Sequence, residues 1–219
     1  MHTQRVVTDT KVLPEKIVDV ERVLRQKSER LYHLLPGFVI RWLKRILHEE
    51  EVNRILFKFR EKKDVDFIRS VLDEMQLGVK AEGFMDWEPG KRYIFVANHP
   101  LGGMDGLAFI RTVGEKLPDI VFPVNDLLMN LPNTKGIFIP VNKHGRNPQL
   151  VRMLDETFAG GKTLLYFPAG LCSRRQNGEI MDLDWKKTFV AKARLHQRDI
   201  VPVHITGSNS RFLDRKSVV

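Results

Sequence analysis

The chain has 219 residues, of which 42% are hydrophobic and 29% are charged. These proportions are ordinary for a folded chain and exclude disorder along most of its length, and the length suits one α/β domain with additional helices. The formal net charge of +9 favours binding to polyanions, which include nucleic acids, anionic lipid head groups and phosphorylated cofactors.

The sequence shows no disulfide pair, no secretory signal and no stretch long enough to span a membrane. Cys172 is the single cysteine, so no intrachain disulfide can form. Residues 1–15 lack the apolar core of a secretory signal. The longest stretch without Asp, Glu, Lys or Arg is Tyr93–Met104, which is shorter than the ~20 residues that cross a bilayer. If the protein meets a membrane, we expect it to lie on the surface.

Residues 1–78 form a charged region with a helical pattern, which we interpret as a membrane-associating domain. Apolar residues recur among charges over Glu15–Leu35, and Pro36-Gly37 interrupts that pattern. A second helix is predicted over Phe38–His48, and one or two more over Glu51–Gln76.

The segment Phe38–Leu47 predicts a basic amphipathic helix. Phe38, Trp42 and Ile46 share one face at helical spacing, while arginine and lysine occupy the other. Such a helix is typical of a membrane interface, and these three residues are the predicted membrane contacts. The alternative is a helix packed on the rest of the fold with a solvated basic face.

From Val79 onward, short apolar strands alternate with segments of helical length. This alternation predicts an α/β fold with a mixed, mostly parallel sheet flanked by helices, over residues 79–219. The predicted strands are Tyr93–Ala97, Ile120–Val124, Gly136–Val141, Thr163–Phe167 and Ile200–Ile205, and the predicted helices are Gly106–Leu117, Pro148–Ala159 and Asp184–Gln197.

The strand Tyr93–Ala97 runs directly into Asn98-His99, and a turn containing Gly102 and Gly103 then leads to Asp105. Ligands of parallel sheets bind at the carboxyl ends of strands, where this histidine is expected. If the glycines let the turn fold back, Asp105 fixes the tautomer of His99 and leaves its other nitrogen free to accept a proton. The alternative is that Asp105 only caps the next helix and His99 is an ordinary turn residue.

Three later segments carry further motifs. The first is Gly136-Ile-Phe-Ile-Pro-Val-Asn142, which leads into a basic loop with Lys143 and Arg146. The second is Leu165-Tyr-Phe-Pro-Ala-Gly-Leu-Cys-Ser-Arg-Arg175, which combines a strand with a turn, and the third is the last strand, Ile200-Val-Pro-Val-His-Ile205. Together with the His99 segment, they resemble the four ordered blocks of the glycerolipid acyltransferases: Asn-His-x4-Asp, Gly-x-Ile-Phe-Ile, Phe-Pro-Glu-Gly-Thr-Arg-Ser and Val-Pro-Val.

The sequence also departs from this family pattern. Five residues separate His99 from Asp105, Ala169 replaces the family glutamate, and Cys172 stands in place of the family arginine. This variant is similar to the branch called hemolysin-like, which is associated with acylation of amino-acid-containing lipids. The chain stops fourteen residues after Ile205, where we expect the family to continue, so its C-terminus is expected to be truncated.

The resemblance implies an acyltransferase that takes a fatty acyl group from acyl carrier protein or coenzyme A and transfers it to a hydroxyl of a lyso-lipid. His99 is the implied general base, with an unperturbed pKa of about 6.5, and Asp105 is its partner. The turn at Gly102 and Gly103 is expected to stabilise the oxyanion. No metal or other cofactor is expected, and the enzyme is placed peripherally on the cytoplasmic face of the membrane. The acceptor is expected to contact Arg174 and Arg175, together with Ser173, Lys143 and Arg146.

Three other interpretations stay open at this point. The His99–Asp105 pair is compatible with a lipid ester hydrolase, which would release fatty acid without an acceptor. The net charge is compatible with a nucleic-acid-binding module, although aromatic and basic residues do not alternate along the strands. Cys172 is a candidate nucleophile because arginines follow it, but a small buried residue is the more common role of such a cysteine.

Overall fold

The computed structural model describes residues 16–83, 87–88, 90–125, 128–141, 147–176 and 179–207. The chain divides into two compact units between Arg60 and Glu61. Within the described ranges, no helix has both the length and the apolar character needed to cross a membrane.

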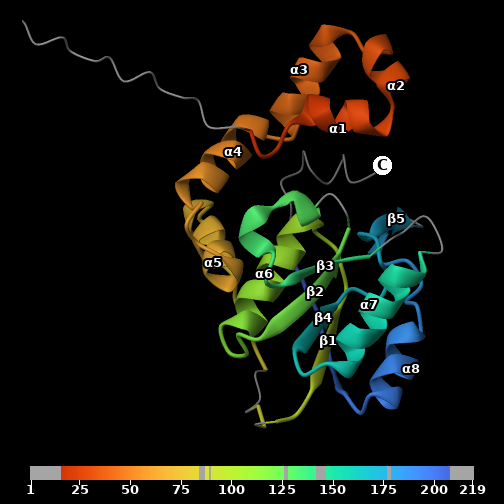
Figure 1. Ribbon diagram of the computed structural model, residues 1–219. Coiled ribbons are helices and arrows are strands. Elements are labelled where there is room, and N and C mark those ends of the chain that lie inside the picture. The colour runs from red at the N-terminus through yellow and green to blue at the C-terminus, as the bar shows by residue number, and fades with distance from the viewer. Residues whose placement is uncertain are drawn as a thin grey trace, which may run out of the picture. The chain divides into compact units, whose positions relative to one another are not determined.

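Over residues 16–60, which are the described part of the first unit, the chain forms four helices, and this confirms the helical character predicted here (Figure 1). The helices are α1 (Val20–Lys27), α2 (Glu29–Leu34), α3 (Gly37–Ile46) and α4 (Glu49–Lys58). The side chains of Asp19 and Ser28 cap α1 and α2 by accepting backbone N–H groups of the first turn. Glu49 is almost fully buried and accepts hydrogen bonds from Lys16 Nζ and the Val20 N–H, both at 2.9 Å, which ties α4 to the start of α1.

The second unit contains a parallel five-stranded sheet in the order β3-β2-β4-β1-β7, so the predicted α/β fold with a mostly parallel sheet is confirmed. Its strands are β1 (Tyr93–Ala97), β2 (Ile120–Val124), β3 (Phe138–Pro140), β4 (Thr163–Tyr166) and β7 (Asp199–Val203). All five residues of β1 are buried, as expected for a continuous apolar run in the middle of a parallel sheet.

Helices cover both faces of this sheet (Figure 1). On one face lie α5 (Asp64–Glu74) and α6 (Gly103–Gly114), and on the other lie α7 (Pro148–Ala159) and α8 (Thr188–Leu195). Phe158 of α7 and Phe189 of α8 pack with Ile94, Val96 and Leu164 in one buried cluster. Two short 3-10 helices, Leu128–Asn130 and Pro132–Thr134, connect β2 with β3.

A second, two-stranded sheet follows β4 and was not predicted from the sequence. It is an antiparallel hairpin of β5 (Arg174–Gln176) and β6 (Glu179–Met181). Its strands have three residues each and carry charged side chains, so they lack the apolar run or alternation that reveals a strand in a sequence.

Candidate active site

The candidate site lies where two neighbouring strands of the sheet end. β1 and β4 pair in parallel with Ile94 opposite Leu164 and Val96 opposite Tyr166, so the segments that follow them leave the sheet at the same edge. His99 lies two residues after β1, and the Pro168–Ser173 turn follows β4. The topology therefore brings together two sequence motifs that are about seventy residues apart.

His99 and Asp105 form a hydrogen-bonded pair. Nδ1 of His99 lies 2.9 Å from Oδ2 of Asp105, which is fully buried in the first turn of α6. The same oxygen accepts the backbone N–H of Leu101 at 2.7 Å. Asp105 therefore supports the turn and orients the imidazole at the same time, and the Nε2 atom of His99 points to the opposite side of the ring from the carboxylate.

Glycine has a conformational role in this turn. Gly102 has a φ of 74° and precedes the first residue of α6, and a side chain at this φ would strain the backbone. Pro100 has no N–H group, and the Leu101 N–H is bonded to Asp105. The backbone N–H groups that remain in the turn belong to Gly102 and Gly103, at the positive end of the helix dipole.

An aromatic cluster fixes the plane of the imidazole. The His99 ring stacks on Phe167 with 4.0 Å between ring centroids and 12° between planes. Phe167 in turn contacts Phe109 and Phe122 of the core. Only 16% of the His99 side chain is exposed. The ring is consequently held by packing on one face and by Asp105 at one edge.

Asp182 fixes the backbone of His99, a role that no sequence pattern indicated. Its Oδ1 atom accepts the His99 N–H at 3.1 Å and also the hydroxyl of Ser173, while Oδ2 accepts the Trp185 indole N–H at 2.8 Å. The Ser173 N–H donates to the His99 carbonyl at 2.8 Å. One carboxylate thus joins the loop after β1 to the segments on either side of the β5–β6 hairpin.

Cys172 lies on the open side of the imidazole, with its Sγ atom 3.3 Å from His99 Nε2. Burial alone lowers the pKa of His99, but hydrogen bonds to Asp105 and Cys172, together with the charge on both partners, outweigh burial and raise the pKa to about 9. The assumption of an unperturbed pKa near 6.5 is therefore wrong for this site. The sequence could not reveal this shift, because the thiol becomes a neighbour of the ring only in the fold.

The sequence was compared with protein families and with curated proteins. Residues 22–219 match the sequence model of a family described as acyltransferase. The chain belongs to this acyltransferase family.

Two relatives of the acyltransferase carry a more specific name. A lyso-glycine lipid O-acyltransferase of Bacteroides thetaiotaomicron is 41% identical over 198 residues, which cover 90% of this chain and 73% of the relative. A protein of the same name from Phocaeicola vulgatus is 40% identical over 198 residues, with coverage of 90% and 71%. The resemblance to aminolipid acyltransferases, which was inferred from the departures from the four family blocks, is thus confirmed.

The structure places the predicted acceptor-binding residues of the acyltransferase in different environments. Arg174 and Arg175 are exposed on β5, directly after the turn that carries Cys172. Ser173 is buried, and its hydroxyl is bonded to Asp182, so it supports the loop in this arrangement. Lys143 and Arg146 lie outside the described residues, as does His144.

Two further residues near His99 have structural roles that the sequence pattern did not predict. Asp182 lies 83 residues from His99 in a stretch without regular pattern. Asn98 bonds both backbone groups of Ile205, at 2.9 Å and 2.6 Å, and so ties the end of β1 to the segment after β7. The only hint of Asn98 in the sequence was its place beside His99 in the first block. In the part of the chain that is described, no group of three or more His, Cys, Asp or Glu side chains is suited to hold a metal ion.

Proposed function

We propose that this acyltransferase moves a fatty acyl chain from a thioester donor to the hydroxyl of a lyso-glycine lipid or a closely related lyso-aminolipid. The observation that carries the proposal is the buried Asp105 bonded to His99, in a chain about 40% identical to two lyso-glycine lipid O-acyltransferases. Acyl carrier protein and coenzyme A are both suitable donors in this proposal, because each presents the acyl group as a thioester.

The reaction needs one proton acceptor and one site for developing negative charge. His99 Nε2 takes the proton of the acceptor hydroxyl while the oxygen attacks the thioester carbonyl carbon. The N–H groups of Gly102 and Gly103 stabilise the resulting oxyanion, a role typically worth ~3 kcal/mol for each donor. The C–S bond then breaks, and the leaving thiolate receives the proton from the imidazolium, whose positive charge Asp105 stabilises in the meantime.

At least one of the two exposed arginines of β5 suits the acidic group of the acceptor. An N-acylated glycine keeps a free carboxylate, and a guanidinium can bond both oxygens of a carboxylate at once. Because Cys172 occupies the position of the family arginine, the positive charge lies two and three residues further along the chain. This displacement favours a bulkier acidic acceptor than glycerol 3-phosphate.

The proposal is tested with purified enzyme, a radiolabelled acyl donor and a panel of acceptors. We expect transfer to lyso-glycine lipid, little transfer to glycerol 3-phosphate, and a raised acceptor KM in Arg174→Ala or Arg175→Ala at an unchanged donor KM. The corresponding lysine variants should recover part of the loss. Rapid turnover of glycerol 3-phosphate without turnover of lyso-glycine lipid would overturn the acceptor assignment, and release of fatty acid without an acceptor would identify a hydrolase.

The pH dependence of the reaction should report the contact between Cys172 and His99. With a pKa of about 9, only about 1% of the imidazole is neutral at pH 7, so kcat/KM should rise with pH and level off above pH 9. Cys172→Ala removes one hydrogen bond and one negative charge that raise this pKa, so the rising limb should move to lower pH. The measurement is kcat/KM between pH 6 and about 10. An unmoved limb would contradict this account, and loss of all activity with no acylated intermediate in the variant would point to a covalent role of the thiol.

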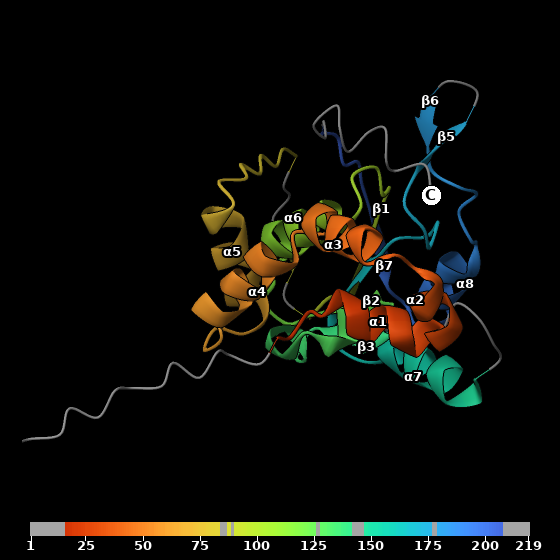
Figure 2. The same ribbon diagram turned by 90° about the horizontal axis from the view of Figure 1, so that it is seen from above.

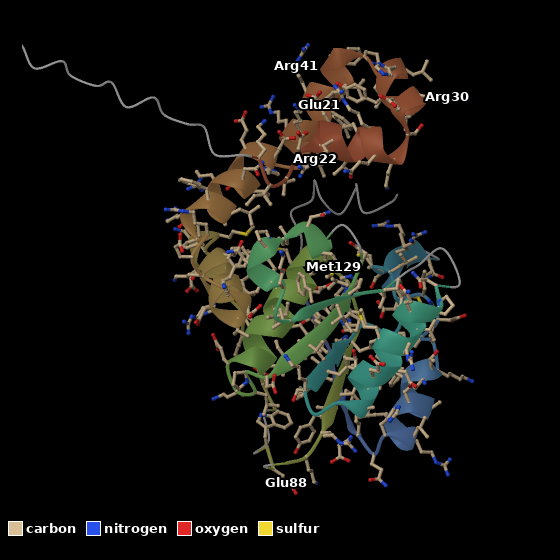
Figure 3. All side chains as sticks on the ribbon, in the orientation of Figure 1. Glu21, Arg22, Arg30, Arg41, Glu88 and Met129 are labelled. Atoms are coloured by element: carbon tan, nitrogen blue, oxygen red, sulfur yellow. The ribbon has the colours of Figure 1, made fainter. Side chains whose placement is uncertain are left out.

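We also propose that the first unit attaches the enzyme to the cytoplasmic face of the membrane. Apolar side chains of α2 and α3 are exposed: Leu31 by 49%, Leu34 by 78%, Phe38 by 66% and Trp42 by 54%. Arg30 of α2 and Arg41 of α3 are exposed on the same helices (Figure 3). Ile46, the third predicted contact, is half-buried. Apolar residues flanked by basic ones are typical of an interfacial helix.

Replacing both Phe38 and Trp42 with Glu should release the enzyme from anionic vesicles without unfolding it. The measurement is co-sedimentation with phosphatidylglycerol vesicles, with circular dichroism to check the fold. Phe57→Glu is the matched control, because Phe57 is 47% exposed on α4 of the same unit. If the Phe38 and Trp42 variant unfolds, or binds vesicles as the control does, the attachment surface is not α3.

A further inference from the structure

The β5–β6 hairpin exposes apolar side chains beside arginines. Ile180 and Met181 are each 48% exposed. In the antiparallel register Arg175 lies opposite Ile180 and Arg174 lies opposite Met181. Since successive residues of a strand point to opposite faces, each face of the hairpin presents one arginine beside one apolar side chain.

The hairpin stands clear of the parallel sheet (Figure 2). A two-stranded hairpin of this size is marginally stable in water, and apolar side chains exposed on both faces add nothing to its stability there. The same composition suits the boundary of a bilayer. Apolar side chains enter the acyl region, while arginines keep their charged ends at the level of the anionic head groups.

The hairpin is also joined to the catalytic loop. Ser173 directly precedes β5 and Asp182 directly follows β6, and the two are bonded to each other and to the backbone of His99. The hairpin therefore projects from the edge of the parallel sheet at which β1 and β4 end. The exposed Leu195 of α8, by contrast, precedes the start of β7 and lies towards the opposite edge.

We propose that the β5–β6 hairpin is a second lipid contact, through which Ile180 and Met181 enter an anionic bilayer and hold the His99 site against a membrane-embedded acceptor. The proposal rests on the proposed function in one respect, because it takes the acceptor to be a membrane lipid. The occupant is a lipid surface, because arginine beside apolar side chains complements anionic head groups and acyl chains together.

The test compares Ile180→Ser/Met181→Ser with the control Val190→Ser/Leu195→Ser, whose residues are 48% and 67% exposed on α8. Each variant is assayed with lyso-glycine lipid in phosphatidylglycerol vesicles and with a short-chain lyso-glycine lipid below its critical micelle concentration. The hairpin variant should need roughly tenfold more vesicle lipid for half-maximal rate and should bind acceptor-free vesicles correspondingly more weakly. Its kinetics with the monomeric acceptor should match those of the wild type, and the control should match in all three measurements.

Wild-type dependence on vesicle lipid in the hairpin variant would overturn the proposal. An equal loss of rate on vesicle and monomeric acceptors would also overturn it, since the hairpin would then only support the His99 loop. If the wild type acylates neither acceptor, the proposed function fails. Binding to acceptor-free vesicles needs no turnover, so in that case it still decides the role of the hairpin.

Discussion

Replacing His99 with Ala is expected to reduce acyl transfer by roughly 10²–10⁴-fold, because the variant lacks the group that removes the hydroxyl proton in the proposed mechanism. Only 16% of the His99 side chain is exposed, and it packs on Phe167, but it lies at the edge of the sheet outside the continuous apolar core. The variant should therefore stay folded. The measurement is kcat/KM for both substrates together with a thermal unfolding curve.

The Asp105→Asn variant distinguishes the effect of the negative charge of Asp105 from the effect of its hydrogen bonds. A single oxygen of Asp105 accepts both the Leu101 N–H and the His99 ring, so asparagine can keep both hydrogen bonds with its carbonyl oxygen. Asparagine lacks the negative charge that, in the proposed mechanism, stabilises the imidazolium in the transition state. We expect a severe fall in kcat and a lower pKa of His99, because two of the effects that raise this pKa come from Asp105.

His204→Ala is the control for both variants, since His204 is an exposed histidine of the same unit. It should leave kcat and both KM values unchanged. Near-normal transfer by folded His99→Ala protein would exclude this imidazole as the base.

Replacing Arg198 with Met is expected to destabilise the second unit by about 3–5 kcal/mol, because the buried guanidinium donates charge-assisted hydrogen bonds to several backbone carbonyls. Arg198 is 5% exposed and lies between α8 and β7. Its side chain donates to five carbonyl oxygens at 2.6–3.1 Å: those of Tyr93, Thr157, Phe158, Gly160 and Lys162.

These five carbonyls belong to the start of β1, to the end of α7 and to the turn that leads into β4. Methionine fills similar volume but offers no donor, so all five of these hydrogen bonds would be lost from a site that is at least partly buried. The thermal unfolding temperature should fall by about 10 °C or more. Arg198→Lys should recover only part of the loss, because an ammonium group cannot span the same set of oxygens.

Arg194→Met is the matched control, because Arg194 is an exposed arginine in the last turn of α8. Its unfolding temperature should stay close to that of the wild type. If Arg198→Met and Arg194→Met unfold at the same temperature, the carbonyl cluster is not a source of stability.

The parallel sheet could be predicted from the sequence because its strands are short apolar runs bounded by turn residues, and β1, β2 and β4 appear almost as predicted. The pairing of His99 with Asp105 was also accessible, since both lie in one segment between a strand and a helix. These features depend on local pattern, which a sequence records directly.

Other parts of the site depend on contacts between segments that are distant in the sequence, and no local sequence pattern predicts these contacts. Asp182 occurs in a charged stretch that is typical of a surface loop, and Arg198 stands between Gln197 and Asp199 in an equally polar setting. Their roles follow from where β4, β1 and β7 bring the chain together. The raised pKa of His99 has the same origin, because Cys172 is 73 residues away in sequence.

The position of Cys172 allows occupancy of the site to be measured by chemical labelling of this chain. The chain has a single cysteine, which is exposed and lies 3.3 Å from Nε2 of His99, the proposed proton acceptor. A maleimide fluorophore would therefore attach at one known place without any engineered mutation. The rate of labelling would measure how strongly each bound donor or acceptor protects Cys172. Binding of a substrate beside His99 can therefore be titrated separately from turnover.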